Sequence, residues 1–273
     1  MRAVAALSCV LALVFMGGVW AEQIGGPSEP SEQGLSIGAE GIFRNLEGHF
    51  MVQDQGIPLN GDGGVVAQNT GYWPSERVRL TTETYYGVAQ YAITDRLSIR
   101  GKAGISDLEL DFGRAGSYEF ENGFAWAAGA QYRICAPAGE GTSLALSGQF
   151  ARSEPDDYYG VVGPVLNRFV NPKVEEINVA LTVGSTKGST RPYAGIVWTD
   201  FMFEFERLSA SRNVIVFPEA RQLPMGRQYW CLDRQRVGGV FGLQQSLGGS
   251  GWLGVEARAW DESSIAATLS LGF

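Results

Sequence analysis

Apolar residues alternate with small or polar residues in a series of segments along this chain, and this two-residue period is typical of β-strands with one apolar face. The last segment, residues 265–273 (IAATLSLGF), is the clearest example. The same alternation recurs in nine earlier segments, at residues 35–44, 80–93, 97–105, 124–134, 144–151, 177–184, 197–206, 236–244 and 252–260. The pattern predicts an all-β chain of about ten antiparallel strands, within a range of eight to twelve because residues 213–217 (NVIVF) are compatible with an extra hairpin.

The connections between these segments alternate in length. Short turns at 94–96, 135–141, 185–191 and 247–251 separate longer connections at 45–78, 107–122, 153–173 and 206–233. Membrane-spanning barrels have short periplasmic turns and long extracellular loops. We therefore predict an antiparallel up-and-down transmembrane β-barrel over residues 35–273, with its apolar strand faces toward lipid and both ends of the strand region on the periplasmic side.

The N-terminal residues predict export. Arg2 precedes an apolar run at residues 3–16, and the small residue Ala21 follows. This order is typical of a cleaved signal peptide, here residues 1–21, and the run is shorter than the roughly 20 residues of a spanning helix. Residues 22–34, rich in Gly, Pro, Ser and Glu, are expected to form a disordered periplasmic tail. The expected location is the outer membrane of a diderm bacterium.

Charge and cysteine content narrow the classes of function. The net charge of −8 argues against nucleic acid as a partner. Two cysteines follow the signal peptide: Cys135 lies at a predicted periplasmic turn and Cys231 in a predicted outer loop, too far apart for a disulfide. We expect a monomer without cofactor or metal, in contact with outer-membrane lipid and lipopolysaccharide.

The opposite strand faces predict what fills the barrel. Ten strands leave little room inside, so charges of both signs are expected to form ion pairs that plug the lumen. The predicted lumen-lining residues are Glu40, Arg44, Arg100, Lys102, Arg133, Asp200, Glu204, Arg236, Glu256 and Arg258. A narrow channel for ions or small solutes is the first alternative.

Candidate chemistry is sparse. The chain has one histidine, His49, in the first long connection, so an outer-rim enzyme, either a protease or a lipid A modifying enzyme, is a weaker alternative, and we assign no catalytic residue. The acidic run at residues 106–112 (SDLELDF) suits a solvated strand extension better than a calcium site. Arginine side chains bind phosphate well, so a lipopolysaccharide contact is a hypothesis for the loop cations Arg207, Arg212, Arg221 and Arg227.

Two segments resemble known proteins. The final strand, with Leu269, Leu271 and the terminal Phe273, resembles the C-terminal strand of bacterial outer-membrane proteins. That resemblance implies recognition by the barrel-assembly machinery during insertion. Residues 91–99 (YAITDRLSI) resemble a periplasmic hairpin of the OmpA-type transmembrane barrel family, although the family's eight strands and peptidoglycan-binding domain are not matched.

The sequence thus predicts a small, non-enzymatic outer-membrane barrel, structural or surface-interacting through its long loops. A soluble periplasmic barrel is the third alternative. It is disfavoured because one set of strand faces is too apolar for water and the other too charged for a core.

Overall fold

The computed structural model describes residues 34–54, 58–59, 64–65, 73–113, 116–135, 141–162, 165–185, 188–211, 226–248, 250–259 and 263–273. The predicted signal peptide and nearly all of the predicted tail lie outside these residues. Within the described part of the chain, no helix is long and apolar enough to cross a membrane.

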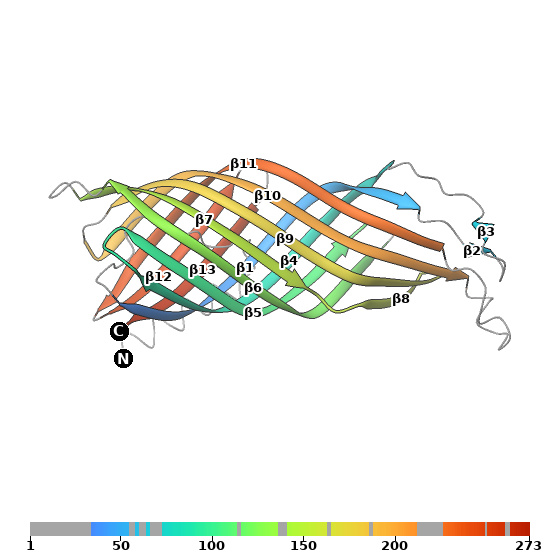
Figure 1. Cartoon of the computed structure of the whole chain (residues 1–273), viewed down its shortest axis with the longest axis horizontal. Coiled ribbons are helices and arrows are strands. Elements are labelled where there is room, and N and C mark those ends of the chain that lie inside the picture. Colours follow the sequence, from blue (N-terminus) through green and yellow to red (C-terminus); the bar gives the residue numbers. More distant parts are fainter. Residues whose placement is uncertain are drawn as a thin grey trace.

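The described chain is built of antiparallel β-strands that wind around a common axis (Figure 1). Ten of them form a closed ring in the order β1, β4, β5, β6, β7, β9, β10, β11, β12 and β13, since β10 pairs with β9 and β13 pairs with β1. This confirms the predicted fold class and strand number. The bounds are β1 Leu35–Asp54, β2 Pro58–Leu59, β3 Gly64–Val65, β4 Trp73–Ala92, β5 Leu97–Asp111, β6 Ser117–Cys135, β7 Thr142–Glu154, β8 Tyr158–Val162, β9 Val165–Ser185, β10 Thr190–Ser211, β11 Gly226–Gly248, β12 Gly251–Ala259 and β13 Ser263–Gly272.

The strand number of the wall falls from ten to eight along the barrel axis. The β12–β13 hairpin is short, with strands of 9 and 10 residues, whereas β1 and β11 have 20 and 23 residues. β1 pairs with β13 as far as Asn45 and then pairs directly with β11 from Met51 onward. The end with the short turns and both termini therefore has ten strands, and the end with the long connections has eight.

The four longer connections were predicted too long. β1 continues to Asp54, β5 to Asp111 and β10 to Ser211, so strands occupy much of the sequence that was assigned to loops. The connection at 153–173 is largely a hairpin of β8 and β9. Residues 213–217 lie outside the described residues. The strand extensions carry charged residues at outward positions, so the alternation of apolar outward residues that predicts the strands does not continue into them.

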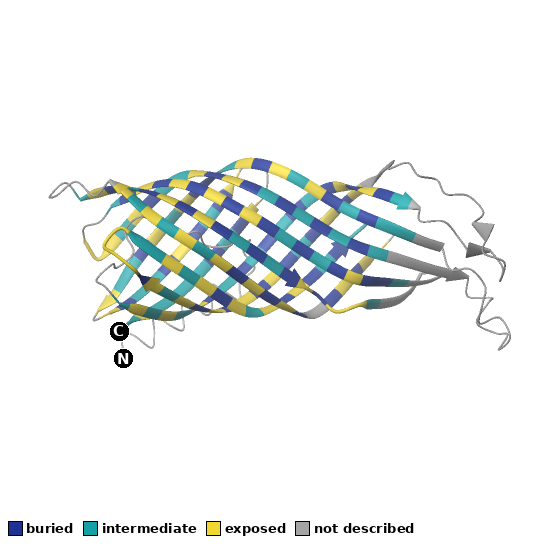
Figure 2. Ribbon diagram, in the orientation of Figure 1, coloured by how far each residue is buried: buried dark blue, intermediate teal, exposed yellow. Residues whose placement is uncertain are grey.

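Buried and exposed positions alternate along every strand of the wall (Figure 2). In the ten-stranded part the outward positions are apolar: Leu35 and Ile37 on β1, Ile99 and Ile105 on β5, and Val179 on β9 are all exposed. On β1 this apolar band runs from residue 35 to 43. Nine tilted strand residues span roughly 20–25 Å, the thickness of the apolar band of an outer-membrane barrel.

Beyond this band the polarity of the two faces is reversed. On β1 the outward residues become Asn45, Glu47 and His49, while Leu46 and Phe50 point inward and are buried. The other long strands change in the same way, and their first polar or charged outward residues are Glu83, Asp107, Arg152, Glu175, Asp200 and Gln235. The eight-stranded part thus has a polar outside and an apolar inside, as expected for a barrel wall in water.

The reversal predicts opposite responses at two outward positions of β10. Ile196, in the apolar band, is 57% exposed, and Met202 lies beyond the reversal beside Asp233 of β11. We expect Ile196→Arg to lower the free energy of unfolding by about 2–4 kcal/mol because it places a cation in hydrocarbon. Met202→Arg should change the free energy of unfolding by less than about 0.5 kcal/mol. Denaturant unfolding in phospholipid vesicles measures both, and equal losses would contradict the assigned membrane boundary.

Candidate functional site

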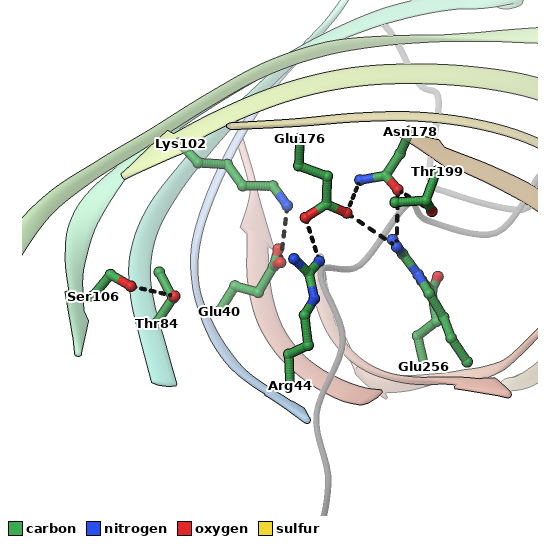
Figure 3. Close-up of polar contacts among 10 residues, drawn as sticks. Glu40, Arg44, Thr84, Lys102, Ser106, Glu176, Asn178, Thr199 and Glu256 are labelled. Carbon is green, nitrogen blue, oxygen red and sulfur yellow. Dashed lines mark hydrogen bonds and ion pairs between the residues drawn. The ribbon is translucent and has the colours of Figure 1, made fainter. Parts of the chain in front are cut away.

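The lumen of the ten-stranded part contains a layer of buried charge. Among the described residues, four cations and three carboxylates are buried: Arg44, Lys102, Arg236, Arg258, Glu40, Glu176 and Glu256. They come from five strands of the ring, and most of them meet in the middle of the lumen (Figure 3). Charges removed from water in this way must be paired, because isolated buried charges are costly.

Two ion pairs form the centre of this layer. Lys102 Nζ lies 2.8 Å from Glu40 Oε1, and both side chains are fully buried. Arg44 pairs with Glu176, and Arg258 NH1 lies 3.5 Å from the other oxygen of the same carboxylate (Figure 3). Glu176 therefore joins β1 to β12 across the lumen. The two carboxylates together connect side chains from β1, β5, β9 and β12.

Neutral donors and acceptors complete the layer. Asn178 Oδ1 accepts hydrogen bonds from Thr199 Oγ1 at 2.8 Å and from Arg258 NH1 at 3.1 Å. Tyr193 donates its hydroxyl to Glu256 Oε2 at 2.7 Å. The Tyr193 ring fits because its partner across the strand pair is Gly242, where an added Cβ would lie 2.0 Å from the ring.

The lumen of the eight-stranded part is filled by an apolar core. Phe50, Phe203 and Phe205 are fully buried or nearly so, and the Phe50 ring meets the other two edge-on at centroid distances of 5.6 and 5.5 Å. Other buried members are Leu46, Val52, Val78, Leu80, Leu108, Leu110, Tyr118, Phe120, Phe169, Val174, Phe201, Trp230 and Leu232. An eight-stranded barrel is just wide enough for side chains to fill, so this core seals the outer end.

The lumen near the short turns is polar and holds small cavities. One, of about 40 Å³, is lined by Gln90, Arg100 and Trp252 among others, and a second, of about 20 Å³, by Gln131 and Gln149. Each has room for one or a few waters. The turn at 93–96 closes as expected, because Thr94 Oγ1 accepts hydrogen bonds from the backbone N–H of Arg96 and of Leu97.

Eight of the ten predicted lumen residues point inward in the structure. Six of them are buried in the charge layer: Glu40, Arg44, Lys102, Arg236, Glu256 and Arg258. Arg100 and Arg133 are half-buried near the short turns, where Arg100 donates to Gln90 Oε1 at 2.8 Å and Arg133 to the carbonyl of Asp95 at 3.2 Å.

The prediction was wrong for Asp200 and Glu204. Both side chains point outward on β10. The odd-numbered residues of the same strand, Thr199, Phe201, Phe203 and Phe205, are buried inside. The error has a physical reason. The prediction assigns the apolar face of this strand to lipid along its whole length. From Asp200 onward, however, β10 lies outside the apolar band, where water contacts the outward face and the inward face is packed against apolar side chains.

The residues predicted for other roles are distributed around the outside. His49 is exposed on β1, and Asp107 and Glu109 point outward on β5, as a solvated extension requires. On β13, Leu271 and Phe273 are exposed and Leu269 is half-buried, and Phe273 N–H donates to the carbonyl of Leu35 at 2.9 Å. Cys231 is a free, half-buried thiol on β11.

Two of the four arginines proposed for lipopolysaccharide, Arg207 and Arg227, lie on strands far from the apolar band. Arg207 on β10 is seven residues beyond Asp200, which places it roughly 18 Å above the band for a wall of tilted strands. Arg227 lies on β11 beside Leu208, and its side chain and that of Arg207 are not among those described. Arg212 and Arg221 lie outside the described residues. This height does not favour a contact with phosphates just above the leaflet.

A groove of about 700 Å³ lies on the outer surface of the wall, where Pro155, Asp156 and Asp157 interrupt the line of β7 and β8. Its rim is charged: Lys173 Nζ lies 2.8 Å from Glu175 Oε1, and Arg152 pairs with the same carboxylate at 3.3 Å. The hydrogen bond from Lys173 to Glu175 raises the pKa of that lysine. These pairs stabilise the charged forms on the water-facing side of the wall.

Sequence reasoning missed Glu176, Thr199 and the whole apolar core. Glu176 continues the inward set that includes Asn178, so the two-residue period was sufficient to place it. The apolar core has a subtler signal. On β1 the apolar residues shift from odd positions, such as Leu35 and Ile37, to even positions from Leu46 onward, and that shift marks the polarity reversal.

A closed antiparallel barrel with an apolar outer band and a buried charge layer behind it defines a class of protein. The chain folds as an antiparallel transmembrane β-barrel.

The sequence matches no described protein family, and no curated protein matches it. Several solved structures are similar in fold. The β-domain of the Bordetella autotransporter BrkA has a TM-score of 0.48 at 12% identity, covering 89% of this chain and all of that one. OprG from Pseudomonas aeruginosa has 0.44 at 7% identity, covering 91% and 99%. The outer membrane protease OmpT from Escherichia coli has 0.41 at 8% identity, covering 86% and 97%. Likenesses of this size assign no activity to this chain.

The Lys102–Glu40 pair predicts strong coupling between two substitutions. Lys102→Met leaves the Glu40 carboxylate buried beside an apolar side chain, and we expect a loss of about 3–5 kcal/mol in the free energy of unfolding. Adding Glu40→Gln removes the buried charge and should recover most of this loss. The exposed pair of Arg79 with Glu47 provides the control, because Arg79→Met should cost at most about 1 kcal/mol. Independent, additive losses at residues 40 and 102 in denaturant unfolding would show that the pair is not coupled.

Proposed function

We propose that the chain is a non-conducting, non-enzymatic outer-membrane barrel that carries its long connections on a rigid extension above the membrane. The observation that carries this proposal is the filled lumen. A conducting barrel needs a continuous polar path, whereas here a layer of paired charge is followed by a core of packed aromatic and aliphatic side chains. The internal cavities near the charge layer and the short turns have volumes of about 40, 40 and 20 Å³.

The eight-stranded extension supports a role in surface interaction. Strands β1, β10 and β11 continue about ten residues beyond the apolar band, and their interior is packed like that of a soluble domain. Packing of this density keeps the extension stiff, so the residues that it carries are held well outside the lipid. The charged groove beside β8 offers a polar surface at that height.

Single-channel recording tests the non-conducting part of the proposal. The purified, folded protein in planar bilayers should give no discrete conductance steps, with a porin in the same bilayers as the positive control. Folding is checked separately by the heat-dependent mobility shift on a denaturing gel, so that silence is not mistaken for failed insertion. Reproducible ohmic steps from the folded protein would overturn the proposal in favour of a narrow channel.

A further inference from the structure

Three buried polar side chains on the inner wall formed by β7 and β9 have atoms without a hydrogen-bond partner among the described residues. These atoms are Ser147 Oγ, Gln149 Nε2 and Thr182 Oγ1. The exposed fractions of the three residues are 4%, 8% and 0%. Ser147 pairs with Ala180 on β9, so Thr182 lies diagonally across from it and the three residues form one patch. Buried polar groups are normally satisfied, so this patch points to a hydrogen-bonding molecule that the chain itself does not supply.

A cavity adjoins two of these groups. Ser147 and Gln149 line a space of about 20 Å³ in the part of the lumen near the short turns, together with residues of β4, β5 and β6. Gly129 on β6 leaves this space open, because it lies across from Gln149 and an added Cβ would lie 3.2 Å from the Gln149 Cβ. The described lining residues include no carboxylate. A cavity of this size holds one water molecule, and a buried water makes about three hydrogen bonds.

We propose that this cavity binds one ordered water molecule as a fixed part of the structure. The water accepts a hydrogen bond from Gln149 Nε2 and makes a second with the Ser147 hydroxyl. Gln131, which lies across from Ser147 on β6 and lines the same cavity, offers a third contact. Water fits this lining because it both donates and accepts hydrogen bonds and adds no charge to a buried space. The proposal is independent of the non-conducting role, because the site lies outside the apolar core that fills the outer end.

The bound water connects the wall of β6 and β7 to the buried charge layer. Gln149 is the cross-strand neighbour of Asn178, whose Oδ1 accepts hydrogen bonds from Thr199 Oγ1 and Arg258 NH1. Side chains directly opposite one another on neighbouring strands have their Cβ atoms about 4.5–5.5 Å apart. By holding the Gln149 amide, the water fixes a side chain that lies beside this edge of the layer. It is therefore a structural link between the polar cavities near the short turns and the ion pairs.

Nuclear magnetic resonance detects a water at the Gln149 amide directly. The full chain is prepared folded in detergent micelles, with deuterium in place of its carbon-bound protons. We expect the Gln149 side-chain amide protons to give nuclear Overhauser and rotating-frame cross-peaks to water that are opposite in sign to each other. That combination indicates a bound water rather than exchange of the amide protons with solvent. Ser147→Val fills the space with methyl groups and should abolish this pair of cross-peaks.

Two controls define the site. Ser147→Ala removes the hydroxyl but keeps the space, so the Gln149 cross-peaks should persist, which excludes magnetisation relayed through the Ser147 hydroxyl. Gln235, an exposed outward amide on β11, should show only exchange with solvent in every variant. The heat-dependent mobility shift confirms that each variant is folded. Absence of the opposite-sign cross-peaks in the folded unmodified chain, their loss in Ser147→Ala or their survival in Ser147→Val would overturn the proposal.

Unfolding equilibria distinguish a bound water from a group that is simply unsatisfied. Gln149→Met removes a partner of the water and should lower the folding equilibrium constant about tenfold, whereas removal of an unsatisfied group would raise it. The matched substitution Gln235→Met should change the constant by less than about twofold. Chloride titration tests for an ion in place of water, and the Gln149 amide signals should not respond to it. A higher folding constant for Gln149→Met, or a saturable shift of those signals with chloride, would contradict the assignment of the cavity to water.

Discussion

The structure depends on one constraint: each long strand passes from hydrocarbon into water while its backbone stays paired. Barrel closure satisfies the backbone groups within the apolar band, and most of the strand ladders continue beyond it. The side chains cannot stay the same, because the outward face must be apolar against lipid and polar against water. β1 shows the solution within one strand, with Leu35 and Ile37 outward in the band and Glu47 and His49 outward beyond it.

The polarity of the side chains inside the barrel depends on what surrounds the wall at the same height. Beyond the band, water lies on the outside, so burying Phe50, Phe203 and their neighbours gains hydrophobic free energy, as in a soluble domain. Inside the band the wall already faces lipid, and an apolar interior would gain less over the surroundings. There the lumen holds Glu40, Lys102 and Glu176, whose ion pairs and hydrogen bonds fix how the strands face one another. The step from ten strands to eight comes near the same boundary, where β13 begins opposite Asn45.

The two-residue period was enough to predict the strands, the closed ring and most of the buried charge layer. It failed where one assumption, apolar outward, was applied along a whole strand, and so it misplaced Asp200 and Glu204. On β1 the information is present as a shift in the parity of apolar positions, from Leu35 and Ile37 to Leu46. What periodicity cannot supply is pairing across the lumen: nothing in the spacing of Glu176 indicates that it meets both Arg44 and Arg258.

The seal at the outer end divides the molecule into two independent faces. Among the described residues, the aromatic core fills the lumen between the end that holds Arg100 and Arg133 and the outer extension. Any influence of one face on the other must then travel through the wall or the buried charges rather than by passage of a ligand. Because the packed core resists gradual deformation, such coupling would require a second discrete arrangement of the charge layer. In the described part of the chain, the filled lumen therefore separates the outer extension from the end with the short turns.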